Sequence, residues 1–377
     1  MFSKMKLVNN TRNKSERNAC FANTALQLLY SVSRMQTFFK MREYKLPSED
    51  KRQMKICDEI ARLFNSDGNY ASSAAVLRHL IATKSGRLYF KDGTQQDIVE
   101  FLITLLQEVE EELSEGNREA KAVLQEFWGK ERTEKKFLNK SNGLCMKCKS
   151  SPRDEEERFQ VIQLDIPETS QVILLNGIVD NYFSENADIA QMKCNCCTHK
   201  TNCPQTGDCK PKPFASKRVL VKSPDVLILQ INRFSNLDGS KTDTTVWPNN
   251  IITLSSGEEY KLCGIGHHLG SDFRSGHYIS SVTNDGEWIR YNDTESSQKS
   301  ESDSKSIECN VCIYTKVYST SKMEISPKHL QTLPEKNSLN TKQMENESIL
   351  REGNKIDISE DEEWLTPKKK EDFQNVD

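Results

Sequence analysis

A cysteine stands where the sequence changes from polar to apolar residues. Residues 15–19 are polar apart from one alanine, and Cys20 follows them directly. Beyond it, apolar residues recur at three- and four-residue steps: Phe21, Ala25, Leu28, Leu29 and Val32. This spacing predicts a helix that begins close to Cys20. The N-terminus of a helix favours an anion, and the anionic thiolate is the nucleophilic form of cysteine. Cys20 is therefore either a nucleophile or a buried core thiol.

A histidine and an aspartate lie in a stretch with the pattern of a β-hairpin. Residues 276–293 read GHYISSVTNDGEWIRYND, two alternating segments joined by a turn. A turn centred on Asp285 places His277 opposite Asp293, with Cβ atoms about 4.5–5.5 Å apart. A carboxylate at that distance can hold an imidazole in one tautomer. A shift of one residue in the register would break this pairing and leave an ordinary surface hairpin.

Four cysteines form two Cys-x-x-Cys pairs: Cys145, Cys148, Cys194 and Cys197. Two such pairs predict a tetrahedral Cys₄ zinc site of the zinc-ribbon kind. Cys196 is interpreted as a bystander, because Cys194 and Cys196 are too close for a normal knuckle. Three residues near the second pair could substitute as ligands: His199, Cys203 and Cys209. The alternative is four thiols that bind no metal.

Composition limits the classes of partner and compartment. The formal net charge is −3 without a lysine–arginine stripe, so we expect no nucleic-acid binding. No stretch approaches the roughly 18 apolar residues of a membrane span. The first residues, MFSKMKLVNNTRNK, contain no apolar run of the signal-peptide kind. We therefore expect a cytoplasmic or nuclear protein whose 12 cysteines are reduced and serve metal binding or catalysis.

The elements that must position these residues fall into two regions. Helical patterns continue to about residue 128, and the clearest helix has Thr94 as a plausible N-cap and one apolar stripe: Ile98, Leu102, Leu105, Leu106, Val109 and Leu113. Short β-branched or alternating segments follow. This order predicts an α+β domain over residues 1–320. Residues 321–377 are rich in acidic and polar residues and are predicted to be a disordered tail.

The order Cys20, His277, Asp293 is typical of papain-like cysteine hydrolases. The stretch NACFANTALQLL resembles the cysteine box of the ubiquitin-specific proteases, peptidase family C19, and residues 260–293 resemble their histidine box. TQQDIVEFLITLL and PDVLILQINRF are similar to two further family segments. With the cysteine pairs, five segments occur in the family's order between residues 18 and 317.

The resemblance implies a fold and a reaction. The fold would be that of a papain-like protease with a helical thumb, a mixed β palm and zinc-ribbon-like fingers. Cys20 would attack the carbonyl of the ubiquitin C-terminal glycine, with His277 as base and Asp293 orienting it. Ubiquitin and ubiquitinated proteins are the expected partners. Gln96 and Asp97 stand where the family contacts the ubiquitin C-terminus, although helix capping explains Asp97 equally well.

One position departs from the family. The side-chain amide that holds the oxyanion, usually an asparagine five residues before the nucleophile, is replaced by Ser15, and Arg17 and Ala19 replace the usual glycine and threonine. The rival hypothesis is therefore a catalytically weak or inactive ubiquitin-binding scaffold. A third is a zinc-organised interaction module without ubiquitin chemistry.

A short apolar stretch in the tail suggests a further partner. Ile356 and Ile358 precede an acidic run, residues 359–363. This pattern resembles SUMO-interacting motifs, which add a strand to the edge of a sheet, and predicts a weak SUMO contact. An ordinary solvated acidic tail is the alternative.

Overall fold

The computed structural model describes most of the first 318 residues. The described ranges are 5–10, 12–45, 54–66, 70–138, 142–146, 148–167, 169, 171–194, 210–234, 240–272, 275–284, 286–305 and 308–318. Cys197, the other candidate ligands after Cys194, and the predicted tail with its SUMO-interacting stretch lie outside them. No helix of the described residues is long and apolar enough to cross a membrane.

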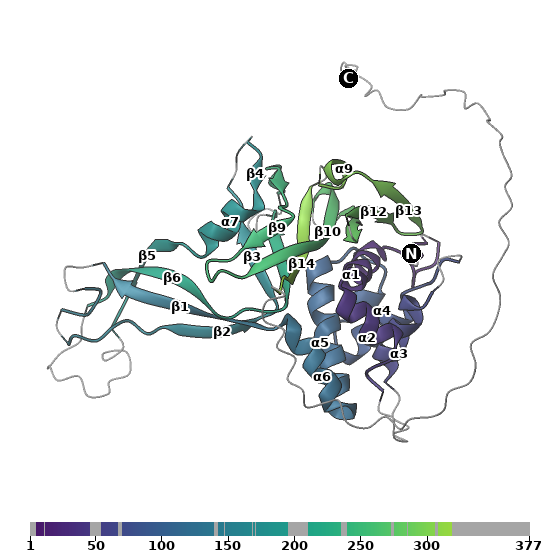
Figure 1. Cartoon of the computed structure of the whole chain (residues 1–377), viewed down its shortest axis with the longest axis horizontal. Coiled ribbons are helices and arrows are strands. Elements are labelled where there is room, and N and C mark those ends of the chain that lie inside the picture. Colours follow the sequence, from purple (N-terminus) through teal and green to yellow (C-terminus); the bar gives the residue numbers. More distant parts are fainter. Residues whose placement is uncertain are drawn as a thin grey trace, which may run out of the picture. The chain divides into compact units, whose positions relative to one another are not determined.

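The helices precede the main sheet along the chain, as Figure 1 shows. They are α1 (Cys20–Ser31), α2 (Ser33–Lys40), α3 (Lys55–Phe64), α4 (Ala75–Lys84), α5 (Ile98–Gly116) and α6 (Arg118–Leu124). Short 3₁₀ turns follow α4 and α6, at Leu88–Lys91 and Gln125–Phe127. The two later helices, α7 (Leu175–Tyr182) and α9 (Glu301–Lys305), lie between strands. The α+β class predicted from the sequence is confirmed.

An eight-stranded mixed sheet forms the centre of the domain, with the order β13-β12-β11-β10-β14-β7-β3 and β9 paired to β10. Its strands are β3 (Val161–Asp165), β7 (Val226–Asn232), β9 (Ile251–Thr253), β10 (Glu259–Asp272), β11 (Ser275–Asn284), β12 (Glu287–Asn292), β13 (Glu295–Lys299) and β14 (Cys309–Lys316). The β3–β7 pair is parallel, and the other pairs are antiparallel. A two-stranded parallel sheet pairs β4 (Ile173–Leu174) with β8 (Val246–Trp247).

A separate four-stranded sheet extends away from the helices (Figure 1). It has the order β2-β1-β6-β5 and consists of β1 (Gly129–Phe137), β2 (Glu155–Phe159), β5 (Glu185–Met192) and β6 (Lys212–Lys222). This sheet carries three cysteines of the Cys-x-x-Cys pairs on its connections, because Cys145 and Cys148 lie between β1 and β2 and Cys194 follows β5.

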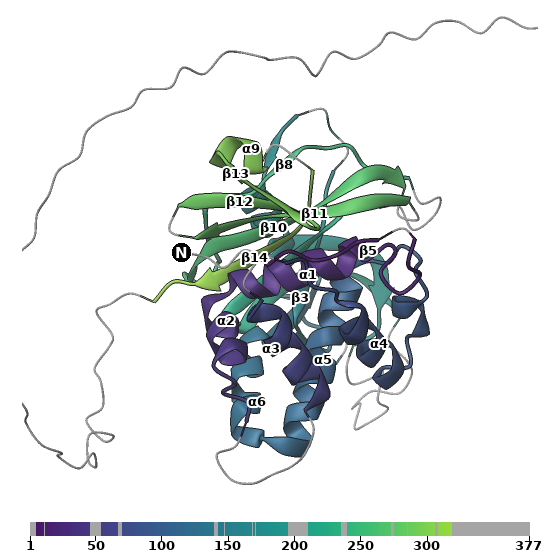
Figure 2. The ribbon, with the colours of Figure 1, turned by 90° about the vertical axis from the view of Figure 1, so that its right-hand side faces the viewer.

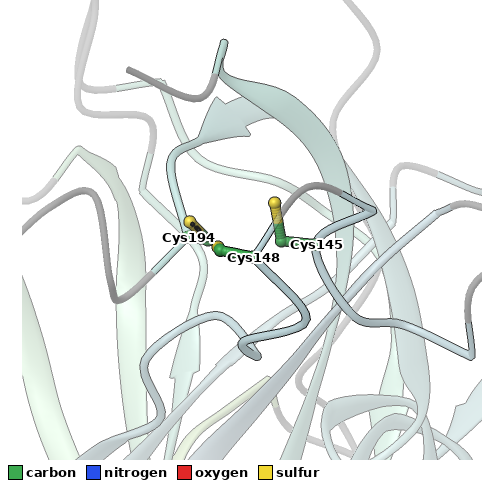
Figure 3. Close-up of side chains that lie close together, drawn as sticks. All are labelled: Cys145, Cys148 and Cys194. Atoms are coloured by element: carbon green, nitrogen blue, oxygen red, sulfur yellow. Dashed lines mark hydrogen bonds between the residues drawn. The ribbon is translucent and has the colours of Figure 1, made fainter. Parts of the chain in front are cut away.

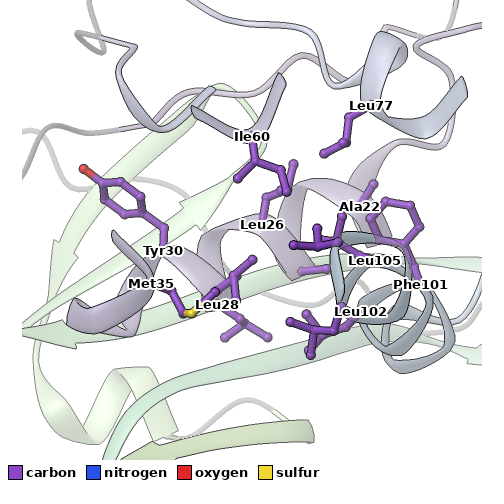
Figure 4. Close-up of a cluster of buried hydrophobic side chains, with 14 of the residues drawn as sticks. Ala22, Leu26, Leu28, Tyr30, Met35, Ile60, Leu77, Phe101, Leu102 and Leu105 are labelled. Atoms are coloured by element: carbon purple, nitrogen blue, oxygen red, sulfur yellow. The ribbon is translucent and has the colours of Figure 1, made fainter. Parts of the chain in front are cut away.

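Helix α1 is buried along its whole length between the other helices and the main sheet (Figures 2 and 4). Two glycines of β10 permit the close approach. A Cβ at Gly264 would lie 2.9 Å from the side chain of Leu28, and one at Gly266 would lie 3.2 Å from the same side chain. Because Cβ contacts this short are rare in proteins, a larger residue at either position would push α1 away from the sheet. This packing holds Cys20 over the sheet that carries His277.

Two details differ from the sequence-based predictions. Helix α5 starts at Ile98 with Asp97 as its N-cap, because the Asp97 carboxylate accepts the N–H groups of Val99 and Glu100. The hairpin of β11 and β12 pairs Asn284 with Glu287, so the register is one residue away from the turn centred on Asp285. The two strands are joined by two residues rather than by a turn centred on one, and two-residue connections match the twist of the strands. Gly286, with φ of +88°, is one of these two residues.

Candidate active site

The loop before α1 holds Cys20 in place. Cys20 is the first residue of the helix and 2% exposed. The preceding N–H, of Ala19, donates to Oδ1 of Asn9 at 3.1 Å. The buried guanidinium of Arg78 donates to the carbonyls of Ser15 and Arg17 at 3.1 and 3.3 Å. The nucleophile candidate therefore lies at a helix N-terminus whose approach loop is fixed by hydrogen bonds from elsewhere in the fold.

His277 lies close to Cys20 and to the end of β12. Its side chain is 33% exposed, and its Nε2 lies 2.6 Å from Oδ1 of Asn292 and 3.8 Å from Oδ2 of Asp293. The hydrogen bond to Cys20 raises the pKa of His277 to about 9, against the effect of burial, and Asn292 and the charges of Cys20 and Asp293 add to this. A pKa in this range favours a protonated imidazole at neutral pH.

Asp293 lies closer to residues from the N-terminal part of the chain than it does to His277. It lies with Thr294 between paired Asn292 and Glu295, and its φ of +52° is left-handed. Its carboxylate accepts the side-chain amides of Asn9 and Asn23 at 2.9 and 2.8 Å. Asp293 therefore joins three segments beneath the site and contributes its charge to His277 across 3.8 Å.

Asn292 was not predicted as a site residue. Sequence reasoning matched it to the histidine box but placed the partner of His277 at the next position. The observed register removes the predicted pairing of His277 with Asp293. The paired residues of β11 and β12 end at Ser280 and Tyr291, so neither His277 nor Asp293 takes part in this ladder. The left-handed turn at Asp293 then leaves the amide oxygen of Asn292 as the nearest acceptor for the imidazole.

We expect Asn292→Ala to move the alkaline limb of the kcat/KM profile to lower pH. In the reaction expected from the sequence, the imidazolium gives its proton to the leaving amine, and Asn292 is one of the groups that raise the pKa of His277 to about 9. Without this hydrogen bond, His277 loses its proton at lower pH. Asp293→Asn serves as the comparison, with a smaller shift expected. A larger shift in Asp293→Asn than in Asn292→Ala would show that Asp293 controls the imidazole.

The residues at the predicted oxyanion and substrate positions make local contacts. Exposed Ser15 donates its hydroxyl to Oδ1 of Asn13 at 2.8 Å. The amide of Gln96 donates to Oγ1 of Thr94. Asp97 caps α5, and burial raises the pKa of its carboxyl. The adjacent Gln95, which sequence reasoning passed over, contacts the Sγ of Cys20.

Three of the four predicted zinc ligands come together beside the four-stranded sheet of β1, β2, β5 and β6 (Figure 3). The Sγ atoms of Cys145, Cys148 and Cys194 all lie within 4.8 Å of one another, and those of Cys148 and Cys194 are 3.2 Å apart. Burial opposes ionisation of Cys148, but hydrogen bonds from Ser150 and from the other thiols lower its pKa to about 6. Thiolate donors on a tight turn are the chemistry that a structural zinc requires, so these residues fit the predicted metal.

Comparison with known proteins identifies the family. The family model described as ubiquitin carboxyl-terminal hydrolase matches residues 11–323. The chain belongs to this family. The resemblance to the ubiquitin-specific proteases predicted from its motifs is confirmed.

Curated family members are similar over most of the chain. The ubiquitin carboxyl-terminal hydrolase 17-like protein D of Mus musculus is 26% identical over 294 residues, which cover 74% of this chain and 49% of that protein. Ubiquitin carboxyl-terminal hydrolase 26 of Oryza sativa subsp. japonica is 26% identical over 73% of this chain and 24% of that protein. The chain thus spans about half or less of the length of these two family members.

A solved structure shows the same fold. The Ubp8/Sgf11/Sus1/Sgf73 DUB module of SAGA bound to monoubiquitin matches with a TM-score of 0.65 and 18% identity, over 84% of this chain and 70% of that chain. The same module bound to ubiquitin aldehyde matches with a TM-score of 0.63.

Proposed function

We propose that this protein is a deubiquitinating cysteine protease that cleaves the bond after the C-terminal glycine of ubiquitin. The observation that carries the proposal is the contact of Cys20, His277 and Asn292 at the start of α1. It is supported by membership of the ubiquitin carboxyl-terminal hydrolase family. The proposed substrates are proteins that carry ubiquitin on a lysine.

The reaction follows from the positions of these side chains. The thiolate of Cys20 attacks the glycine carbonyl, and the imidazolium of His277 gives its proton to the departing lysine amine. A thioester remains on Cys20. His277, now neutral, removes a proton from water, which attacks the thioester and releases ubiquitin. Asn292 holds the imidazole during both steps, with the charge of Asp293 nearby.

The three thiols beside the four-stranded sheet have a structural role in this proposal. Cys145, Cys148 and Cys194 would hold a zinc ion, with Cys197 as the fourth ligand. When bound, the ion links the two connections of the sheet and supplies no chemistry to the reaction. A cytoplasmic or nuclear location and a SUMO contact through the tail stay predictions.

Two assays on the full chain test the proposal against its rivals. Covalent labelling of Cys20 by ubiquitin propargylamide, located by mass spectrometry, is expected, and an unlabelled protein would point to the zinc-organised interaction module. Turnover of a fluorogenic amide at the ubiquitin C-terminus is expected as well. A labelled protein that shows no turnover would be the inactive scaffold.

A further inference from the structure

The side-chain amide of Gln95 lies against the proposed nucleophile. Its Oε1 and Nε2 are 3.6 and 3.7 Å from the Sγ of Cys20. Gln95 precedes α5 by three residues and is half-buried. Gln96, by contrast, directs its amide to Thr94. Of this pair of glutamines, Gln95 is therefore the one within reach of a carbonyl bonded to Cys20.

The loop that carries Gln95 is attached to the loop before Cys20. The carbonyl of Gly93 accepts the side-chain amide of Asn18 at 2.9 Å and the Nε of Arg17 at 3.3 Å. Gly93 has a φ of +80°, and a Cβ there would lie 2.8 Å from the carbonyl oxygen of Lys14. Glycine is thus required for this close contact, which fixes Gln95 relative to Cys20.

Attack by the thiolate creates a negative charge that needs hydrogen-bond donors. As the bond between Sγ and the carbonyl carbon forms, the π-electron pair of the carbonyl moves to its oxygen. One donor is the backbone N–H of Cys20, since the first N–H groups of a helix have no partner within it. The Ser15 hydroxyl, at the position of the family's amide, donates to Asn13 instead. A second donor must therefore come from another residue.

We propose that Gln95 supplies this second donor, an inference that rests on the proposed function. Its Nε2–H bonds to the oxyanion and keeps its proton throughout. When the oxyanion collapses, the electron pair returns to the carbon and the bond to the leaving amine breaks. Preorganised donors of this kind act mainly in the transition state, so Gln95 contributes to kcat more than to KM.

The test compares Gln95→Ala and Gln95→Glu with the wild-type full chain on the fluorogenic ubiquitin amide. Loss of one oxyanion donor typically lowers kcat by about 10²–10³-fold, and we expect this with an unchanged KM. Gln95→Glu keeps the shape of the side chain but replaces its donor with an acceptor. Gln163→Ala removes an exposed glutamine on β3, at the opposite edge of the main sheet from β13, and is the matched control. Thermal melts verify that each variant folds.

Two ubiquitin derivatives separate this role from ordinary binding of the ubiquitin tail. Ubiquitin aldehyde forms a hemithioacetal whose oxygen occupies the oxyanion position, so its affinity should fall in parallel with kcat. Ubiquitin propargylamide forms no oxyanion, so labelling should be retained. A raised KM with unchanged kcat and unchanged aldehyde affinity would overturn the proposal. Failure of the wild-type protein to react with propargylamide would instead reject the proposed function itself.

Discussion

Replacing Cys20 by serine or His277 by alanine is expected to lower kcat on a ubiquitin C-terminal amide by roughly 10⁴- to 10⁶-fold. The two side chains are hydrogen-bonded, and the interaction with Cys20 raises the pKa of His277. Because they act as a unit, the double variant should be no slower than the slower single variant. Steady-state kinetics with high enzyme concentrations would measure the residual rate.

The control for this experiment is His79→Ala, which removes an exposed histidine from α4. It should leave kcat and KM unchanged. Additive losses in the double variant would contradict a coupled pair and assign Cys20 and His277 to separate steps. A small effect of His277→Ala alone would mean that another base serves Cys20.

Replacing Cys145 by serine is expected to remove zinc and to lower the free energy of unfolding strongly. Structural zinc binds with apparent free energies of about 10–16 kcal/mol, whereas whole domains are stable by about 5–15 kcal/mol. Loss of a small part of that binding energy therefore changes the stability by a large fraction. Elemental analysis should give about one zinc per wild-type chain, and the thermal melting temperature should fall in the variant.

Cys263→Ser is the matched control for the metal site. Cys263 lies on β10, and its Sγ is 3.2 Å from the hydroxyl of Thr315, a contact that serine can retain. Zinc content and melting temperature should both stay at the wild-type values. Wild-type protein without zinc, or Cys145→Ser with an unchanged melting temperature, would reject the metal. Propargylamide labelling of Cys20 should persist in the folded Cys145→Ser variant, since Cys20 and His277 lie on α1 and β11 and not on the four-stranded sheet.

The sequence by itself determined the features that depend on neighbouring residues. The 3.6-residue period placed Cys20 at the start of a helix, because local apolar spacing specifies which face is buried. The change from helical to alternating patterns predicted the α+β class. The Cys-x-x-Cys spacing predicted that Cys145 and Cys148 lie together, since such a pair needs only one tight turn, and the structure adds Cys194 to them from 46 residues away in the sequence.

Tertiary structure alone decided which polar groups meet. An alternating pattern does not specify strand register, so a change of one residue at the turn leaves Asn292 rather than Asp293 nearest to His277. The direction of a loop side chain depends on segments distant in sequence. Gln95 contacts Cys20 only because Gly93 binds the loop before α1, 75 residues away. No local period encodes such a contact, and it exists only once the two segments have packed together.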